Sequence, residues 1–118
     1  MKVAIIGSGD NRQIYRSQLK EISASFGNLV KAAVDIEKVI IAIGGELQAD
    51  EEAVLLENGS QQRNLWGINL YPDLQGEEFI EFDSVINLRP AHGNRTRGID
   101  DPRIRQKIKE IVDSLILS

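Results

Sequence analysis

The apolar residues of the segment Arg12–Phe26 recur at intervals of four, three and four positions. This spacing places them on one face of a helix, where they would pack against a core. Gly27 follows directly, and glycine is common just past the end of a helix. The pattern therefore predicts a first helix over Arg12–Phe26 whose buried face carries Tyr15, Leu19, Ile22 and Phe26.

A second helix is predicted near the end of the sequence. Asp101 followed by Pro102 is typical of a helix start, because aspartate caps the first turn and proline suits the first helical position. The charged residues of this segment fall on a solvated outer face. The stripe expected to be buried consists of Ile104, Ile108, Ile111, Val112 and Leu115.

Two segments in the second half of the chain alternate between apolar and polar residues, as half-buried strands do. In Asn64–Tyr71, one face holds Trp66, Ile68 and Leu70. In Phe79–Arg89, the apolar positions are expected to face the core and the polar positions to face away. Those polar positions are Glu81, Asp83, Asn87 and Arg89. The residues that follow, Pro90–Gly98, are predicted to form a loop.

Two further segments fit both a helix and strands. Leu29–Glu46 contains a helical stripe, but its alternation and the triplet Val39–Ile41 favour a β-hairpin. The hairpin is weakest at its turn, because Glu37–Lys38 lacks the glycine that tight turns prefer. Asp50–Asn58 is either a short helix capped by Asp50 or a strand that turns at its end.

These elements together predict one α+β domain over residues 1–118. Its centre would be an antiparallel sheet of about four or five strands, with an N-terminal and a C-terminal helix packed on one face. A chain of this length can bury a core without disulfides or metal ions. Because the helices would cover one face only, the other face is expected to be polar and open.

Composition narrows the range of functions. The chain has no cysteine and a single histidine, which excludes disulfides, thiol chemistry and any site in one chain that needs two imidazoles. No apolar run approaches the roughly 18 residues that a membrane span needs. We therefore expect a cytoplasmic protein with no membrane partner. No residue pattern indicates a metal site, and none indicates which cofactor, if any, the protein binds.

The net charge of −4 is unevenly distributed. Residues 35–83 hold twelve acidic and two basic side chains, whereas residues 84–118 hold seven basic and four acidic ones. Either the basic segments bind nucleic acid or phosphate, or they face the acidic segment within the fold or across a homodimer. The pI near 5.0 makes nucleic-acid binding the less favoured interpretation.

The segment Gly7–Asn11 resembles the start of a dinucleotide-binding unit, in which glycines bring the backbone close to a pyrophosphate. The third glycine position is occupied by Arg12, and the chain lacks the further strand–helix–strand units of that fold. The pattern is more typical of a strand-to-helix turn capped by Asp10 or Asn11.

The open sheet face and the loop beyond Arg89 form the candidate site. Gly93 and Asn94 suit a positive φ, which would fold the loop back over the strand ends. Arg89 and Arg95 would then bracket the site, either holding an anionic ligand or pairing with carboxylates of the middle strands. The candidate ligand-binding residues are Asp35, Glu37, Asn69, Asn87, Arg89, His92, Asn94 and Arg95.

Three functions fit this arrangement. The favoured one is a binding or regulatory module, a homodimer with an unknown anionic ligand or protein partner. The first alternative is a small hydrolytic or metal-dependent enzyme, with carboxylates acting beside Arg89 and His92; those carboxylates would be Asp35, Glu37, Glu46 and Asp50. The second is RNA binding through Arg95, Arg97, Arg103 and Arg105.

Three long motifs carry a resemblance to a known family. They are GGELxAD at Gly44–Asp50, LLExGSxQxxLWGINLYP across Leu55–Pro72, and FIEFxSxINxRPxxGNRxRGIxD across Phe79–Asp101. Over about Phe26 to Ile116 the chain resembles a small prokaryotic family of unknown function. The resemblance implies a compact single domain and no established activity. It also implies that Gln48 stands where family members often have a histidine, which argues against a metal site formed with His92.

Overall fold

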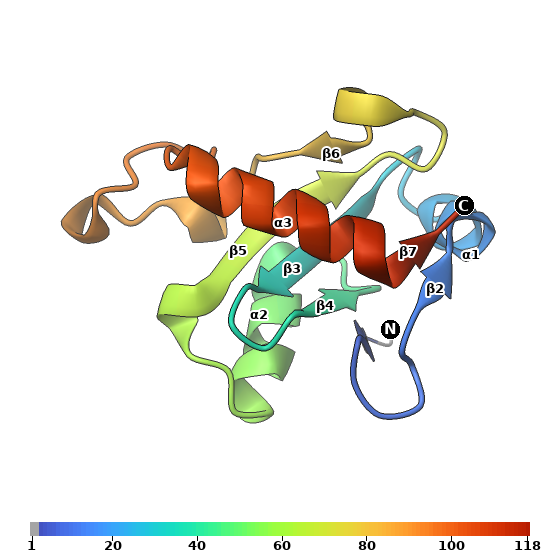
Figure 1. Ribbon diagram of the computed structural model, residues 1–118, viewed down its shortest axis with the longest axis horizontal. Helices are drawn as coiled ribbons and strands as arrows, with labels where there is room; N and C mark the ends of the chain where they lie inside the picture. Colours follow the sequence, from blue (N-terminus) through green and yellow to red (C-terminus); the bar gives the residue numbers. More distant parts are fainter. Residues whose placement is uncertain (1–2) are drawn as a thin grey trace.

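A five-stranded antiparallel sheet lies at the centre of the computed structural model, which describes residues 3–118 (Figure 1). The strands lie in the order β1 (Ala4–Ile6), β4 (Ile40–Ile43), β3 (Val30–Asp35), β5 (Leu65–Leu70) and β6 (Ile80–Glu81). Two short strands, β2 (Ile14–Tyr15) and β7 (Ile116–Leu117), form a separate parallel pair. The α+β fold with an antiparallel sheet, as expected from the sequence, is confirmed.

The α-helices of residues 3–118 are α1 (Arg16–Ser23), α2 (Gln48–Glu57) and α3 (Pro102–Leu115). Helix α3 begins as predicted, because the Asp101 side chain accepts a hydrogen bond from the Arg103 amide at 2.8 Å. Helix α1 begins four residues later than predicted, since Ile14 and Tyr15 pair with β7 instead. None of the helices in this part of the chain is long and apolar enough to cross a membrane.

The segment Gly7–Asn11 closes on itself as a tight loop. The Gly7 amide donates a hydrogen bond to the Asn11 carbonyl oxygen at 2.6 Å, and Ser8 and Asn11 form an isolated bridge. Strand β2 follows this loop rather than a helix, so the predicted strand-to-helix turn is wrong. The loop therefore does not aim its amides along a helix axis, as a pyrophosphate-binding turn would.

Strands β3 and β4 form the hairpin that was favoured for Leu29–Glu46. Its turn needs no glycine, because the Asp35 carboxylate accepts hydrogen bonds from the amides of Glu37 and Lys38, both at 2.9 Å. Val39 then adopts a positive φ of 59°. A left-handed β-branched residue is unfavourable, and the Asp35 contacts compensate for part of that cost.

The segment Asp50–Asn58 forms a helix rather than a strand, and α2 begins slightly earlier, at Gln48. Asn58 caps its end, and Gly59 follows with a φ of 95°. Leu55 on this helix is fully buried against Ala33, Ala42 and Leu65. Small residues on the strands let α2 approach this face of the sheet closely.

Apolar side chains cover both faces of the sheet, so the expected open polar face is absent from the described chain. On the first face, Leu19 of α1 and Ile108 of α3 belong to the larger core cluster. On the second face, Leu55 of α2 belongs to a separate cluster. The N-terminal and C-terminal helices, α1 and α3, thus contribute to one core cluster, whereas α2 covers the face that was expected to be open. The reason lies in β3 and β4, which are apolar at adjacent as well as alternate positions.

The strand predicted over Phe79–Arg89 is much shorter, because only Ile80–Glu81 pairs with β5. At Ser84 the chain turns into a 3₁₀ helix, η3 (Val85–Asn87), whose first turn is capped by the Ser84 hydroxyl. Asn87, expected to face solvent, is fully buried. Its side-chain amide takes the place of a backbone ladder. It accepts from the Gly67 amide at 2.8 Å and donates to the Gly67 carbonyl at 3.0 Å.

Gly67 makes that close approach possible. A Cβ atom added at this position would lie 2.4 Å from both Cβ and Oγ of Ser84. Such a contact is far inside van der Waals distance, so a side chain here would push η3 away from β5. The remaining 3₁₀ turns are η1 (Gln62–Asn64), η2 (Gly76–Glu78) and η4 (Pro90–His92). Turns η1, η3 and η4 surround the outer edge of β5, where the site described next is found.

Candidate functional site

Two of the predicted site residues, Asp35 and Glu37, lie at the β3–β4 turn. Besides the turn amides, the buried Asp35 carboxylate accepts a hydrogen bond from the Ser60 hydroxyl at 2.6 Å. The exposed Glu37 accepts from the Asn64 side-chain amide at 3.3 Å. Neither carboxylate pairs with Arg89 or Arg95 within the described residues. The predicted ion pairs with these arginines are therefore not formed, and Asp35 stabilises the hairpin instead.

Asn69 belongs to a separate polar cluster at the end of β5. Its side-chain oxygen accepts from the Gln48 amide at 2.8 Å, and its nitrogen donates to Glu81 Oε1 at 2.9 Å. Tyr71 donates to the same Glu81 oxygen at 2.8 Å. Burial, together with this contact to Glu81, raises the pKa of the Tyr71 hydroxyl. These groups satisfy one another and connect α2 to β6.

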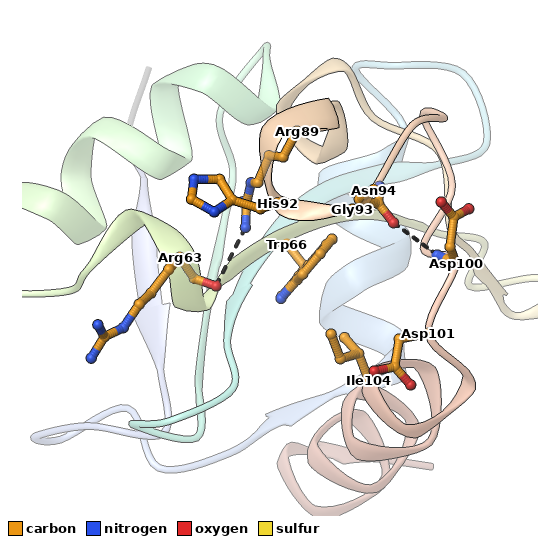
Figure 2. Close-up of a pocket in the computed structure, with 9 residues that line it drawn as sticks. All are labelled: Arg63, Trp66, Arg89, His92, Gly93, Asn94, Asp100, Asp101 and Ile104. Atoms are coloured by element: carbon orange, nitrogen blue, oxygen red, sulfur yellow. Dashed lines mark hydrogen bonds between the residues drawn. The ribbon is translucent and has the colours of Figure 1, made fainter.

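The loop after Arg89 is held in shape by Asn94, which is buried. Its side-chain nitrogen donates to the carbonyl oxygens of Asn87 (2.7 Å) and Gly98 (2.9 Å), and its oxygen accepts from the Asp100 amide at 2.8 Å (Figure 2). The backbones of Arg89 and Asn94 also form a bridge around Gly93, whose φ is 88°. The loop folds back as predicted, and Gly93 has the expected positive φ. Asn94 does not have a positive φ, and it stabilises the loop through its buried side chain instead.

Arg89 connects this loop to β5. Its guanidinium carbon lies 4.4 Å from the centre of the Trp66 ring, which is a cation–π geometry. One Nη donates to the Leu65 carbonyl oxygen and the other to the Arg63 carbonyl oxygen at 3.4 Å. Burial lowers the pKa of Arg89, and the charge of Glu52 partly opposes that shift. The arginine is therefore fixed in position, with its Nη groups already used.

A pocket of about 430 Å³ opens beside Arg89, and we call it the Trp66 pocket. Trp66 and Ile104 provide its apolar lining, while Arg63, Arg89 and Asp101 bring charge to it (Figure 2). His92, Gly93, Asn94 and Asp100 complete the lining. Four elements thus converge on one hollow: η1, β5, the η4 loop and the start of α3.

The indole nitrogen of Trp66 is the unusual atom in this pocket. Trp66 is 6% exposed, and its Nε1 has no hydrogen-bond partner within the described residues. Figure 2 shows the nitrogen-bearing edge of the ring turned toward the side where Arg63 and Ile104 lie. A buried donor without a partner costs about 1–3 kcal/mol. A ligand or water that accepts from it would recover that cost.

A second hollow of about 480 Å³ adjoins the first, and we call it the Glu52 pocket. Arg63, Arg89 and His92 line both pockets. The second pocket adds Glu52 and Gln62 and an apolar edge from Val85, Ile86 and Leu88. His92 thus lies beside Arg89 in the lining of both pockets. Arg95 is exposed and lines neither of these two pockets, and its backbone amide donates to Asp100 at 3.1 Å.

Comparison with known proteins gives a family. A model of a family described as "Protein of unknown function (DUF5674)" matches residues 10–115. The chain belongs to this family. The family of unknown function expected from the sequence motifs is thus confirmed, and the match also takes in α1. No curated protein and no solved structure matches the chain.

The sequence did not predict that Trp66 and Glu52 belong to the candidate site. The sequence placed Trp66 only on one face of a strand, and its contact with Arg89 depends on the loop folding back. Glu52 lies on the segment Asp50–Asn58, for which the sequence allowed both a helix and a strand, and only the helix brings Glu52 toward Arg89.

Across residues 3–118, no group of three or more histidine or carboxylate side chains is placed to hold a metal ion.

Glu51, next to Glu52, is a fully buried acid. Its Oε2 accepts a hydrogen bond from the Gly45 amide at 3.0 Å, while its Oε1 has no partner in the described chain. Burial raises the pKa of Glu51 to about 9, although the Gly45 hydrogen bond acts in the opposite direction. The folded protein therefore holds this carboxyl in its neutral form at pH 7.

We expect Glu51 to make the protein less stable as pH rises from 4.5 to about 9. In that interval the unfolded chain loses the proton and the folded chain keeps it, so the free energy of unfolding falls with pH, by at most about 1.4 kcal/mol per unit. Urea unfolding at pH 5, 7 and 9 measures the slope. Glu51→Gln should flatten it, whereas Glu57→Gln, at an exposed position of the same helix, should not. Equal slopes in wild type and Glu51→Gln would contradict this expectation.

Proposed function

We propose that this protein is a binding module for a small organic acid, which it holds in the Trp66 pocket. The observation that carries the proposal is the buried, unpartnered Nε1 of Trp66 at a hollow of ligand size. Binding pockets combine a mostly apolar lining with a few fixed polar groups. Here Trp66 and Ile104 supply the apolar surface, and the Trp66 N–H supplies a donor.

The charged groups of the pocket that have no partner favour an acidic ligand. Its two carboxylates already have partners, because Asp101 accepts from Arg103 and Asp100 accepts from the Arg95 amide and the Thr96 hydroxyl. The guanidinium of Arg63 is exposed and makes no hydrogen bond to the described residues, so it is available to an anion. Arg89 adds a second positive charge at a fixed position. Arginine binds carboxylates and phosphates through parallel N–H donors. The rigid loop around Asn94 lowers the entropy cost of closing such a site around a ligand.

The enzyme and RNA-binding alternatives gain no support from the geometry. Asp35 closes the hairpin turn, and none of the four carboxylates proposed for the enzyme lines either of the two pockets that His92 lines. Of the four arginines proposed to bind RNA, three have internal partners. Arg97 pairs with Asp83 at 2.7 Å, Arg103 pairs with Asp101 at 3.2 Å, and Arg105 donates to the Ile99 carbonyl oxygen. That the protein forms a homodimer and is located in the cytoplasm are predictions from the sequence.

The single tryptophan of the chain makes the proposal testable by nuclear magnetic resonance. A ¹H–¹⁵N spectrum has one side-chain indole cross-peak, which reports on Trp66 alone. Cyclohexanecarboxylate and benzoate serve as probes. We expect both to shift this peak with saturation, and Arg63→Gln to weaken binding about tenfold, the equivalent of 1.4 kcal/mol.

Arg95→Gln is the matched control, because Arg95 is an exposed arginine outside both pockets. Its affinity for the two probes should equal that of the wild type. The proposal fails if neither probe moves the indole peak at concentrations of about 10 mM, which corresponds to a binding free energy weaker than about 3 kcal/mol.

A further inference from the structure

Glu52 and Arg89 carry opposite charges and both line the Glu52 pocket, but they do not form an ion pair with each other. Glu52 Oε2 and Arg89 Nε are both buried, and neither has a hydrogen-bond partner among residues 3–118. The two groups are close enough for the charge of Glu52 to act on Arg89. Yet none of the ion pairs in the described chain joins them. A carboxylate and a guanidinium in this position normally pair directly or through a group between them.

A group that fills this gap must satisfy a negative and a positive partner at once. The carboxylate of Glu52 accepts hydrogen bonds, so it needs a donor, most effectively an ammonium. Arg89 Nε and the free guanidinium of Arg63 need an acceptor, most effectively a carboxylate. A simple anion such as phosphate satisfies the arginines but is repelled by Glu52. A simple amine satisfies Glu52 but is repelled by the arginines.

We propose that the Glu52 pocket holds the ammonium group of an α-amino acid, whose carboxylate lies where the two pockets join and whose apolar side chain lies in the Trp66 pocket. This inference rests on the proposed function, because it takes the organic acid bound beside Trp66 to be an amino acid. The continuity of the two hollows supports it. Arg63, Arg89 and His92 line both, so one molecule can reach from one pocket into the other. The ammonium then faces Glu52, and the carboxylate faces Arg63 and accepts from the Trp66 N–H.

Three probes of nearly equal shape test the assignment through the Trp66 indole peak. Phenylalanine carries both charged groups, 3-phenylpropionate lacks the ammonium, and phenethylamine lacks the carboxylate. We expect phenylalanine to bind at least about tenfold more tightly than either of the others, since one ion contact of 1.4 kcal/mol gives that ratio. Glu52→Gln should reduce the preference for phenylalanine over 3-phenylpropionate to below about twofold. It should not lower the affinity for 3-phenylpropionate, because the repulsion between Glu52 and the carboxylate of this probe is removed.

Glu57→Gln is the matched control, because Glu57 is an exposed carboxylate on the same helix and lies outside the Glu52 pocket. It should preserve the full preference. If 3-phenylpropionate binds as tightly as phenylalanine, the amino-acid inference fails while the proposed function stands. If none of the three probes moves the indole peak, both fail. The comparison of the three probes on the wild-type protein tests the amino-acid inference even if Glu52→Gln does not fold.

Discussion

Removal of residues 101–118 is expected to leave a chain that no longer unfolds cooperatively. Helix α3 contributes four buried residues to the larger core cluster: Ile108, Ile111, Val112 and Leu115. At about 1.5–3 kcal/mol for each buried side chain, they contribute about 6–12 kcal/mol. The net stability of a small domain is about 5–15 kcal/mol. Without α3, the part of the first sheet face that α1 does not cover would be exposed to water.

Circular dichroism during heating and size-exclusion chromatography measure this outcome. The truncated chain should aggregate, or melt without a sharp transition. Single substitutions separate the loss of burial from the loss of chain length. Ile108→Ala should cost about 2–5 kcal/mol, whereas Lys107→Ala on the exposed face should change stability by less than about 0.5 kcal/mol. A truncated protein that stays monomeric and melts sharply would show that the core does not depend on α3.

Replacing Asn87 with alanine is expected to lower the free energy of unfolding by about 3 kcal/mol or more. The side chain of Asn87 is fully buried and bonds to both the amide and the carbonyl of Gly67, and it also donates to the Arg97 carbonyl at 2.9 Å. Each buried backbone group left without a partner costs about 1–3 kcal/mol. Alanine cannot replace any of these contacts.

Urea unfolding measures the change in stability, provided that the slope of free energy against urea concentration stays constant. Asn87→Asp is the informative second variant. It keeps an acceptor for the Gly67 amide but loses the two donors, so it should also be strongly destabilised. Asn28→Ala, at an exposed position, is the control. A cost below about 0.5 kcal/mol for Asn87→Ala would mean that the amide does not hold η3 against β5.

The sequence predicted those elements whose periodicity and end signals agree. The apolar stripe of the last helix and the Asp101–Pro102 start predicted α3 correctly. The alternation of apolar and polar residues in Asn64–Tyr71 predicted β5. The prediction failed where a side chain replaced the backbone as partner. Phe79–Arg89 alternates like a strand, but the amide of Asn87 pairs with β5 in place of a ladder. Asp50–Asn58 could not be decided locally, because its helix is stabilised by burial of Leu55 on the second face of the sheet.

The candidate site was predictable only where it is local in sequence. Arg89, His92 and Asn94 lie within six residues, and glycine and asparagine together signalled that this loop folds back. Trp66 and Glu52 reach the same place through tertiary packing, so no spacing in the sequence connects them to the loop. Asp35 was misjudged for a related reason. Its carboxylate serves the turn amides and Ser60, contacts that depend on the hairpin and on the end of α2.

The outer edge of β5 is protected against pairing with a strand of another copy of this protein. Backbone pairing with β6 covers only Asn69 and Leu70. Farther along the same edge, Asn87 occupies both polar groups of Gly67, and Arg89 occupies the carbonyl of Leu65. An exposed strand edge is a template for another chain to add a strand. Loss of either side chain would therefore expose an unpaired strand edge. Asn87 and Arg89, the second of which also lines both pockets, thus protect the protein against fibril-like assembly.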